Sequence, residues 1–241
     1  MGLAEKAMKP EFRMQLRAHD DMPRINKALA DAASDPNLSI CASALMFVYN
    51  QDRLKMDIDP NALSLMLTLL ESRSEDDEKV DEKHRTKIIG LVEQLKKKGL
   101  AQYLKLTEVS AGKLAMETFL GLTSKRAGDW FKEELRKMNG IDFMLDTVMK
   151  CADNSHDENS MFKIDRCMHV LENVTFNNLT NQKLVTEYKS RKFIEVCINL
   201  MKTCKDQILI GSGDKRVFVS TLFSLLRVFT SLTTESGKFF F

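Results

Sequence analysis

Glycine and proline are scarce in this sequence, with 10 Gly and 4 Pro in 241 residues. Architectures made of many short β-strands need both residue types at their frequent turns, so this scarcity argues against a β-sandwich or β-barrel. The chain is nevertheless 44% hydrophobic, which is enough to bury a large core. Together these two observations favour helices joined by few turns.

Cysteine is also sparse, and its five residues follow no regular spacing. The first twenty residues contain no long apolar run, so we expect no signal peptide and the reduced thiols of a cell interior. No run of about 18 apolar residues occurs, and we therefore predict no transmembrane helix. A formal net charge of only +2 provides no general attraction to nucleic acid or to a membrane.

Motifs for metal binding and catalysis are missing as well. Cys151, His156, Cys167 and His169 lie close together, but they have neither CxxC nor HxxxH spacing, and we interpret Cys167 as a core residue. There is no GxSxG or Cys–His signature, and residues 211–215 (GSGDK) lack the spacing of a phosphate-binding loop. We therefore predict no enzyme activity, no metal, no cofactor and no small-molecule substrate.

Apolar residues at helical spacing are abundant along the whole chain. Leu63, Met66, Leu67 and Leu70, for example, fall at i, i+3, i+4 and i+7, which places them on one face of a helix. Similar stripes recur on both sides of this segment. The pattern predicts an all-α fold.

From residue 111 the helical pattern repeats at an interval of 52 residues. The first-helix residues Ala115, Thr118, Phe119 and Leu122 recur as Cys167, Val170, Leu171 and Val174. The third-helix residues Ile141, Met144, Leu145, Val148 and Met149 recur as Phe193, Val196, Cys197, Leu200 and Met201. The middle helix matches only after a one-residue slip, which pairs Phe131 with Leu184 and Leu135 with Tyr188. Three helices in roughly 40–50 residues are typical of armadillo and HEAT repeats, which bury their faces by stacking.

A further unit begins at Asp214, but the chain ends at Phe241, before the second and third helices of that unit. We therefore expect an α-solenoid of the armadillo/HEAT type that is truncated at its C-terminal end. The predicted domain covers residues 1–236 and residues 237–241 form a tail outside it. The predicted sub-units are 1–100, 111–153, 160–206 and 214–236.

The most distinctive stretch is Leu114–Gly140, which contains the single tryptophan, Trp130. It holds two helical patterns joined by a short basic turn. The second pattern places Phe131 and Leu135 on its apolar side, and we expect Trp130 to be buried with them, although an exposed tryptophan would be a binding hot spot. The opposite, solvated side carries Asp129, Lys132, Glu133, Arg136 and Lys137. We expect Asn139-Gly140 to end this helix, with the glycine in the left-handed conformation.

The run Leu122–Arg136, LTSKRAGDWFKEELR, resembles the signature of the Wings apart-like family, the cohesin-release factors. Phe12–Asp20 (FRMQLRAHD) and Asp52–Glu71 (DRLKMDIDPNALSLMLTLLE) are similar to other parts of the conserved C-terminal domain of that family. The resemblance implies a helical HEAT/armadillo-like domain that binds cohesin and promotes its release from chromatin, without a reaction of its own. The short Phe-Gly-Phe docking motifs of the family are absent from this chain.

The resemblance also implies partners and a location. The expected partners are cohesin subunits and the HEAT-repeat cofactor of cohesin, without direct contact to nucleic acid or membrane. The expected location is the nucleus, on chromatin, with the cytoplasm as a further location. The candidate protein-binding residues, which all lie within the signature, are Lys125, Arg126, Asp129, Lys132 and Glu133.

Two alternatives remain open at this point. A generic armadillo-like adaptor for an extended peptide would have the same helical periodicity. The charged turn at Lys125 and Arg126 is, by periodicity alone, also consistent with ordinary solvated turn residues. Only the specific residues of the signature favour a surface that binds a partner.

Overall fold

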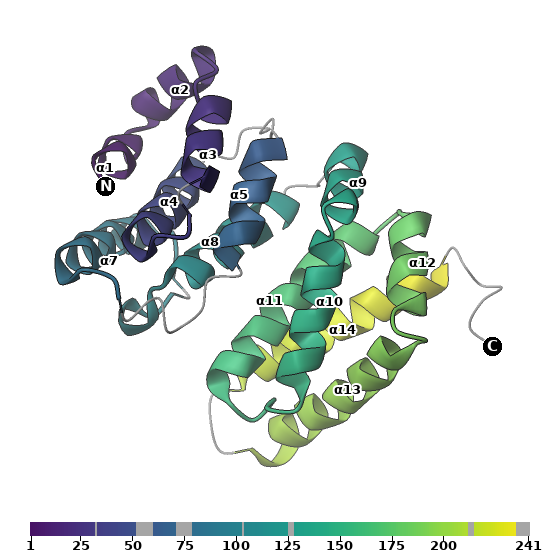
Figure 1. Ribbon diagram of the computed structural model, residues 1–241. Helices are drawn as coiled ribbons and strands as arrows, with labels where there is room; N and C mark the ends of the chain where they lie inside the picture. The colour runs from purple at the N-terminus through teal and green to yellow at the C-terminus, as the bar shows by residue number, and fades with distance from the viewer. Residues whose placement is uncertain are drawn as a thin grey trace. The chain divides into compact units, whose positions relative to one another are not determined.

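The computed structural model of the protein describes residues 1–31, 33–51, 60–70, 79–102, 104–124, 128–211 and 215–234, with the backbone alone for residues 124 and 234. Over these residues the chain forms α-helices and one short 3-10 helix, without a strand (Figure 1). The predicted all-α fold class is confirmed. The chain divides into two compact units, Met1–Lys125 and Arg126–Phe241.

The first unit is built around a fully buried helix, α4. Its elements are α1 (Gly2–Ala7), α2 (Pro10–Ala18), α3 (Met22–Asp31), α4 (Pro36–Tyr49), α5 (Pro60–Leu70), α7 (Glu82–Lys97), η1 (Leu106–Glu108) and α8 (Ala111–Ser124). Every residue of α4 from Ser39 to Tyr49 is buried, because α1, α5, α7 and α8 all pack against it. A helix that is covered on all sides needs no polar face, and this stretch has almost none.

Helix ends in this unit follow the signals in the sequence. Asp35 caps α4, since its Oδ1 accepts a hydrogen bond of 2.8 Å from the backbone N–H of Leu38, and Pro36 occupies the first helical position. After α7, Gly99 adopts φ 79°, and the N–H of Leu100 donates to the carbonyl of Leu95 at 3.0 Å. This is the usual glycine-dependent end of a helix.

Two arginines of the family-like segment Phe12–Asp20 cap helices inside the first unit. The Nη1 of Arg13 donates to the carbonyl of Ala7, the last residue of α1, at 2.6 Å. The Nη2 of Arg17 donates to the carbonyl of Tyr49, the last residue of α4, at 3.0 Å, and its guanidinium lies 4.7 Å from the centre of the Tyr49 ring. Cations are favourable at helix C-termini, where unpaired carbonyls concentrate negative charge.

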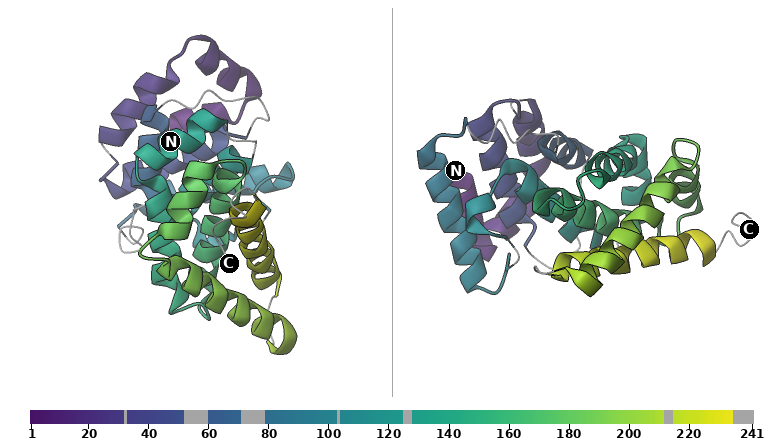
Figure 2. Two further views of the ribbon diagram at one scale, coloured as in Figure 1. Left: turned by 90° about the vertical axis from the view of Figure 1, so that its right-hand side faces the viewer. Right: turned by 90° about the horizontal axis from the view of Figure 1, so that it is seen from below.

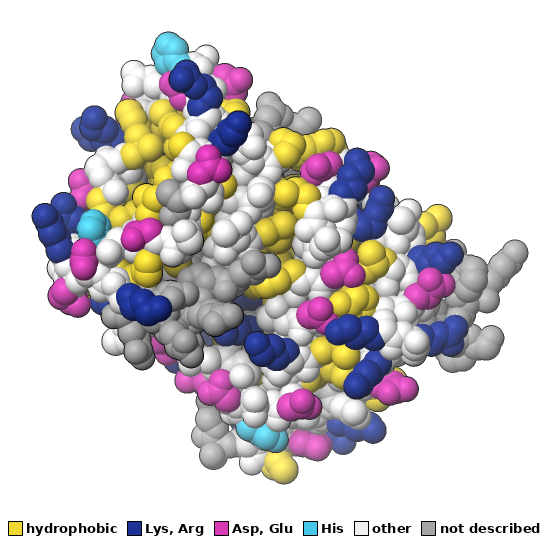
Figure 3. Space-filling view, in the orientation of Figure 1, with side chains coloured by type: hydrophobic (Ala, Val, Ile, Leu, Met, Phe, Trp, Pro, Cys, Tyr) yellow, Lys and Arg dark blue, Asp and Glu magenta, His cyan; other side chains and the backbone are white. Residues whose placement is uncertain are grey.

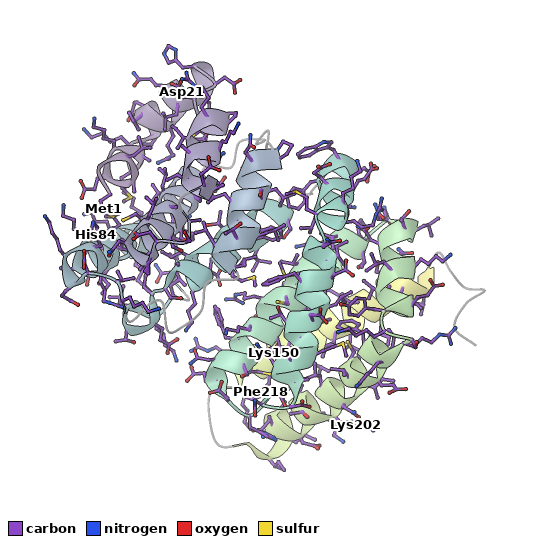
Figure 4. All side chains as sticks on the ribbon, in the orientation of Figure 1. Met1, Asp21, His84, Lys150, Lys202 and Phe218 are labelled. Carbon is purple, nitrogen blue, oxygen red and sulfur yellow. The ribbon has the colours of Figure 1, made fainter. Side chains whose placement is uncertain are left out.

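The second unit is organised around α11. Its helices are α9 (Asp129–Lys137), α10 (Gly140–Ala152), α11 (Glu158–Thr175), α12 (Leu179–Glu187), α13 (Lys192–Ile210) and α14 (Arg216–Thr234). α11 packs against α10, α12 and α14, and α13 runs beside α14 (Figure 2). Lys150 on α10 and Lys202 on α13 are exposed, so these two helices keep a solvated side (Figure 4).

The positions predicted to correspond at 52 residues are buried alike. All four first-helix pairs, from Ala115 and Cys167 to Leu122 and Val174, are buried in α8 and in α11. In α10 and α13, three of the five pairs are fully buried, and Val196 is half-buried where Met144 is fully buried. The first and third helices of the two repeats therefore use the same faces for packing.

The predicted match for the middle helix is wrong. Leu184 and Tyr188 are only half-buried, and Tyr188 lies just beyond the end of α12. The buried positions of α12 are Asn181, Gln182, Val185 and Thr186, and the first three have the same spacing as Phe131, Lys132 and Leu135, the buried residues of α9. The true offset is therefore 50 residues, and hydrophobicity could not reveal it because the buried face of α12 begins with two amides.

The predicted left-handed glycine at the end of α9 is also wrong. Asn139 adopts the left-handed conformation, with φ 58°, and Gly140 is the first residue of α10. Asparagine tolerates this region better than other residues with a side chain. Gly140 is required for space instead, because a Cβ atom there would lie 2.1 Å from Cδ1 of Leu135.

α14 is long and apolar enough to cross a membrane by length and composition, over Arg216–Thr233 with a mean hydropathy of 1.3, and it is the one described helix that meets this test. It packs against α11, α12 and α13. Its fully buried polar side chains, Thr221 and Ser224, hydrogen-bond to residues of α11. These contacts are those of a helix packed within a helical unit.

Candidate docking site

The distinctive stretch Leu114–Gly140, which contains the signature Leu122–Arg136, spans most of α8, all of α9 and the first residue of α10. Two of its predicted contact residues, Lys125 and Arg126, lie outside the described part of the chain. The other three lie on α9, where Asp129 is the first helical residue. An acidic residue at this position also stabilises the N-terminus of the helix.

α9 is anchored by two apolar side chains. Phe131 is 4% exposed and Leu135 is fully buried, and the two lie one turn apart on the face that packs into the second unit. The N–H of Phe131 donates to the carbonyl of Gly128 at 3.0 Å, which closes the first turn of the helix. The sequence predicted both residues as core, and this is confirmed.

Lys132 is not on the solvated side of α9, where the sequence analysis placed it. It is buried, and its Nζ donates to the carbonyl of Phe176 at 2.6 Å. Phe176 is the C-cap residue of α11, so Lys132 places a cation at the negative end of an 18-residue helix. A lysine can bury its aliphatic part while its ammonium group reaches a helix end. A helical pattern alone counts such a lysine as a surface residue.

Arg136 has the same inward orientation, one turn further along. Its Nη1 donates to Oδ1 of Asn181 at 3.3 Å. Asn181 in turn donates from Nδ2 to the carbonyl of Val174 at 3.0 Å, and Gln182 donates to the carbonyl of Thr175 at 3.0 Å. The last carbonyls of α11 are thus satisfied by side chains of α9 and α12, as buried helix ends require.

Trp130 is 48% exposed, so the predicted burial of this residue is wrong. It is the second residue of α9, one residue before Phe131, so its side chain points about 100° around the helix axis from that of Phe131. A nine-residue helix held by Phe131 and Leu135 covers too little surface to bury a third large side chain on its flank. The alternative considered from the sequence, an exposed aromatic side chain, is the one observed.

Glu133 is exposed and points away from the core, as predicted. Its Oε1 lies 3.5 Å from Nζ of Lys137 and 4.0 Å from Nη2 of Arg136. Asp129 is also exposed. On the face shown in Figure 3, cationic and anionic side chains are interspersed and do not form a field of one sign.

The cysteines do not provide a reactive centre. Burial raises the pKa of the thiols of Cys167 and Cys197, and it raises the pKa of Cys204 to about 12. Thiols with raised pKa values stay protonated and are poor nucleophiles and metal ligands. Over the residues that the structure describes, no three Cys, His, Asp or Glu side chains lie together as a metal site.

The sequence analysis missed a polar network between α11 and α14. Asp165, which is 1% exposed, accepts a hydrogen bond of 3.1 Å from the hydroxyl of Thr221, and it pairs with Arg166. One turn further along α11, the two ring nitrogens of His169 lie 3.0 Å from the hydroxyls of Ser220 and Ser224. The sequence pattern that could have revealed this network is a polar stripe on α11, with Asp165, His169 and Glu172 at i, i+4 and i+7.

The hydroxyl of Ser224 joins two side chains of α11. It donates to Oε2 of Glu172 at 3.2 Å and lies 3.0 Å from Nδ1 of His169, and Nδ1 is itself 3.6 Å from Oε2 of Glu172. Glu172 also receives a hydrogen bond of 3.1 Å from Arg227. Partial burial acts to raise the pKa of the Glu172 carboxyl, but the interactions with His169 and Arg227 outweigh it, so this pKa lies below its ordinary value. The network joins two helices.

Helices that pack through polar caps and buried side chains define a helical, HEAT-like domain. The family model described as "Wings apart-like protein regulation of heterochromatin" matches residues 1–239. The chain belongs to the Wings apart-like family, whose members are non-enzymatic regulators with a role in cohesin release.

Individual relatives support this assignment. The chain is 40% identical to the human Wings apart-like protein homolog over 217 residues, which is 86% of this chain and 18% of the relative. It is 37% identical to the Drosophila melanogaster protein wings apart-like over 233 residues, 89% of this chain and 13% of the relative. It is 22% identical to Wings apart-like protein homolog 1 of Caenorhabditis elegans, over 98% of this chain and 33% of that protein. The chain therefore spans a third or less of these relatives.

Proposed function

We propose that this chain is a non-enzymatic docking scaffold that binds cohesin and promotes its release from chromatin. The observation that carries the proposal is the family match over residues 1–239, together with 40% identity to the human relative over most of the chain. The proposed partners are cohesin subunits and the HEAT-repeat cofactor of cohesin. The proposed location is the nucleus, on chromatin.

The proposed mechanism is a shift in equilibrium between closed and open cohesin. A partner favours one state only by the difference between its affinities for the two states. A scaffold that is rigid on binding loses little conformational entropy, so more of its contact energy can favour one state. The side-chain caps on α1, α4 and α11 support such rigidity, because they tie the ends of these helices to neighbouring helices.

The outer side of α9 is the proposed contact surface. Asp129 and Glu133 are exposed there and can reach a partner directly. Lys132 contributes in a different way, since it holds α9 against the end of α11. Lys125 and Arg126 remain proposed contacts from the sequence alone.

Purified cohesin provides the test of this proposal. We expect the chain to co-precipitate with cohesin subunits and to increase the release of cohesin from isolated chromatin. The double charge reversal K125E/R126E should reduce both, while K150E/K202E, which reverses two exposed lysines on α10 and α13, should leave both unchanged.

Failure of the wild-type chain to bind any cohesin subunit would contradict the proposal. Recovery of a peptide ligand without cohesin would favour a generic armadillo-like adaptor instead. If K125E/R126E bound and released cohesin normally, the contact surface would have to exclude the signature turn.

A further inference from the structure

α9 presents a negatively charged outer side, although its nine residues include three cations and three carboxylates. The hydrogen bonds of Lys132 and Arg136 direct two of the cations toward α11 and α12. The outer side therefore retains the exposed carboxylates of Asp129 and Glu133 and, at its edge, the partly buried carboxylate of Glu134. Lys137 is the exposed cation there, and Nη2 of Arg136 also lies 4.0 Å from Glu133. This imbalance arises from folding and is not visible in the composition of the helix.

Trp130 lies on this side, about half exposed, with Glu133 and Glu134 at i+3 and i+4. The two carboxylates already converge on one ammonium, because Nζ of Lys137 lies 3.5 Å from Oε1 of Glu133 and 3.6 Å from Oε2 of Glu134. The spacing therefore accommodates a cation between them. Exposed ion pairs of this kind are weak, so the cation of a partner can replace the lysine.

We propose that Trp130, Glu133 and Glu134 form a docking surface for an arginine-bearing segment of a partner protein. A guanidinium group can stack on the indole ring while its N–H groups pair with a carboxylate. A lysine ammonium lacks the planar fork needed to do both at once, and acidic segments are repelled. This proposal rests on the proposed function, because it takes the outer side of α9 as a docking surface. It adds the chemistry of the partner segment that binds there.

Trp130 is the only tryptophan of the chain, so tryptophan fluorescence reports on this site alone. The probe is the synthetic peptide acetyl-Gly-Arg-Gly-Arg-Gly-amide, and its control carries citrulline, which has nearly the same shape but no charge, in place of arginine. We expect a saturable fluorescence change with the arginine peptide, and binding about fivefold weaker with the citrulline peptide. Equal responses to the two peptides, or no response to either, would overturn the proposal.

A matched pair of variants then tests the carboxylates. We expect E133Q/E134Q to bind the arginine peptide about fivefold more weakly than the wild type. The control E187Q/E195Q makes the same change in net charge on exposed residues of α12 and α13 and should bind like the wild type. Equal losses in both variants would indicate a general charge effect and would overturn the proposed site.

Binding to purified cohesin separates this inference from the proposed function. The informative variant is W130A, with its melting temperature checked against that of the wild type. If the wild-type chain binds cohesin and W130A binds equally well, the docking surface lies elsewhere and only this inference fails. If the wild-type chain does not bind cohesin but the peptide titrations behave as expected, only the proposed function fails.

Discussion

Lys132 holds the end of a helix that lies 44 residues further along the chain. Its ammonium is buried against the carbonyl of Phe176, so two effects depend on it: the hydrogen bond itself and the favourable charge at the C-terminus of α11. In the family signature this residue is one of several charges and looks like a surface contact. Its position shows how a residue can be characteristic of a family for an architectural reason.

We expect K132M to destabilise the chain by about 1–3 kcal/mol, because the carbonyl of Phe176 would lose its charged donor. The measurement is the free energy of unfolding from urea denaturation. The control K137M changes a lysine of the same helix whose side chain is 57% exposed, and we expect a change within about 0.5 kcal/mol. Equal effects for the two variants would show that the Lys132 cap contributes nothing specific.

Gly140 gives a second prediction for a single residue. In G140A the new Cβ would lie 2.1 Å from Cδ1 and 3.2 Å from the carbonyl oxygen of Leu135, which is itself fully buried. We expect a loss of about 1–3 kcal/mol from this overpacking. G90A, in the interior of α7, meets no atom within 4 Å and should instead gain about 0.5–1 kcal/mol from its higher helix propensity. Thermal unfolding of the two variants distinguishes these opposite signs.

Between elements, the contact of α11 with α14 combines polar side-chain pairs with apolar packing. Asp165 and Glu172 on α11 meet Thr221, Ser224 and Arg227 on α14. Satisfied buried polar pairs fix one relative position of two helices, since any shift leaves donors and acceptors unpaired. The seam therefore specifies how this part of the stack is assembled.

Stability carried by this seam should depend on pH through Glu172. The pKa of its carboxyl lies below the ordinary value in the folded chain, so its contribution is present above the pKa of the unfolded state. That contribution is lost as the pH falls through the pKa of the folded state. The pH range over which stability is lost therefore begins at about pH 4.5 and extends to lower pH. We expect E172Q to be less stable than the wild type at pH 7 and to show a smaller loss of stability on acidification.

Urea denaturation at pH 7, 5, 4 and 3 measures this dependence. The variant E195Q, which changes an exposed glutamate of α13, serves as the control and should follow the wild type. Parallel curves for the wild type and E172Q would contradict a role for Glu172 in the seam.

The sequence predicted helices best where apolar side chains dominate the buried face. The first and third helices of the two repeats were matched at 52 residues for this reason. The middle helix was misaligned because Asn181 and Gln182, although buried, are polar. Trp130 was predicted to be buried and Lys132 to be exposed, and the structure shows the reverse. Helical spacing gives only the angle of a side chain around the helix axis, whereas the residues that pack against that side chain depend on the tertiary structure.

At the scale of the whole molecule, several buried polar side chains of the described chain hold helices together, among them Arg13, Lys132 and Asp165. The conserved domain of the Wings apart-like family covers nearly all of it, and the relatives extend well beyond the matched region. On the outer side of α9, Trp130, Asp129 and Glu133 are exposed to solvent.

The most direct test of this account is the amount of cohesin that remains on isolated chromatin after the purified chain is added. The account predicts that bound cohesin decreases as the concentration of the chain increases, and that the decrease requires direct binding to cohesin subunits. Unchanged cohesin on chromatin at concentrations that saturate binding, or no binding at all, would contradict it.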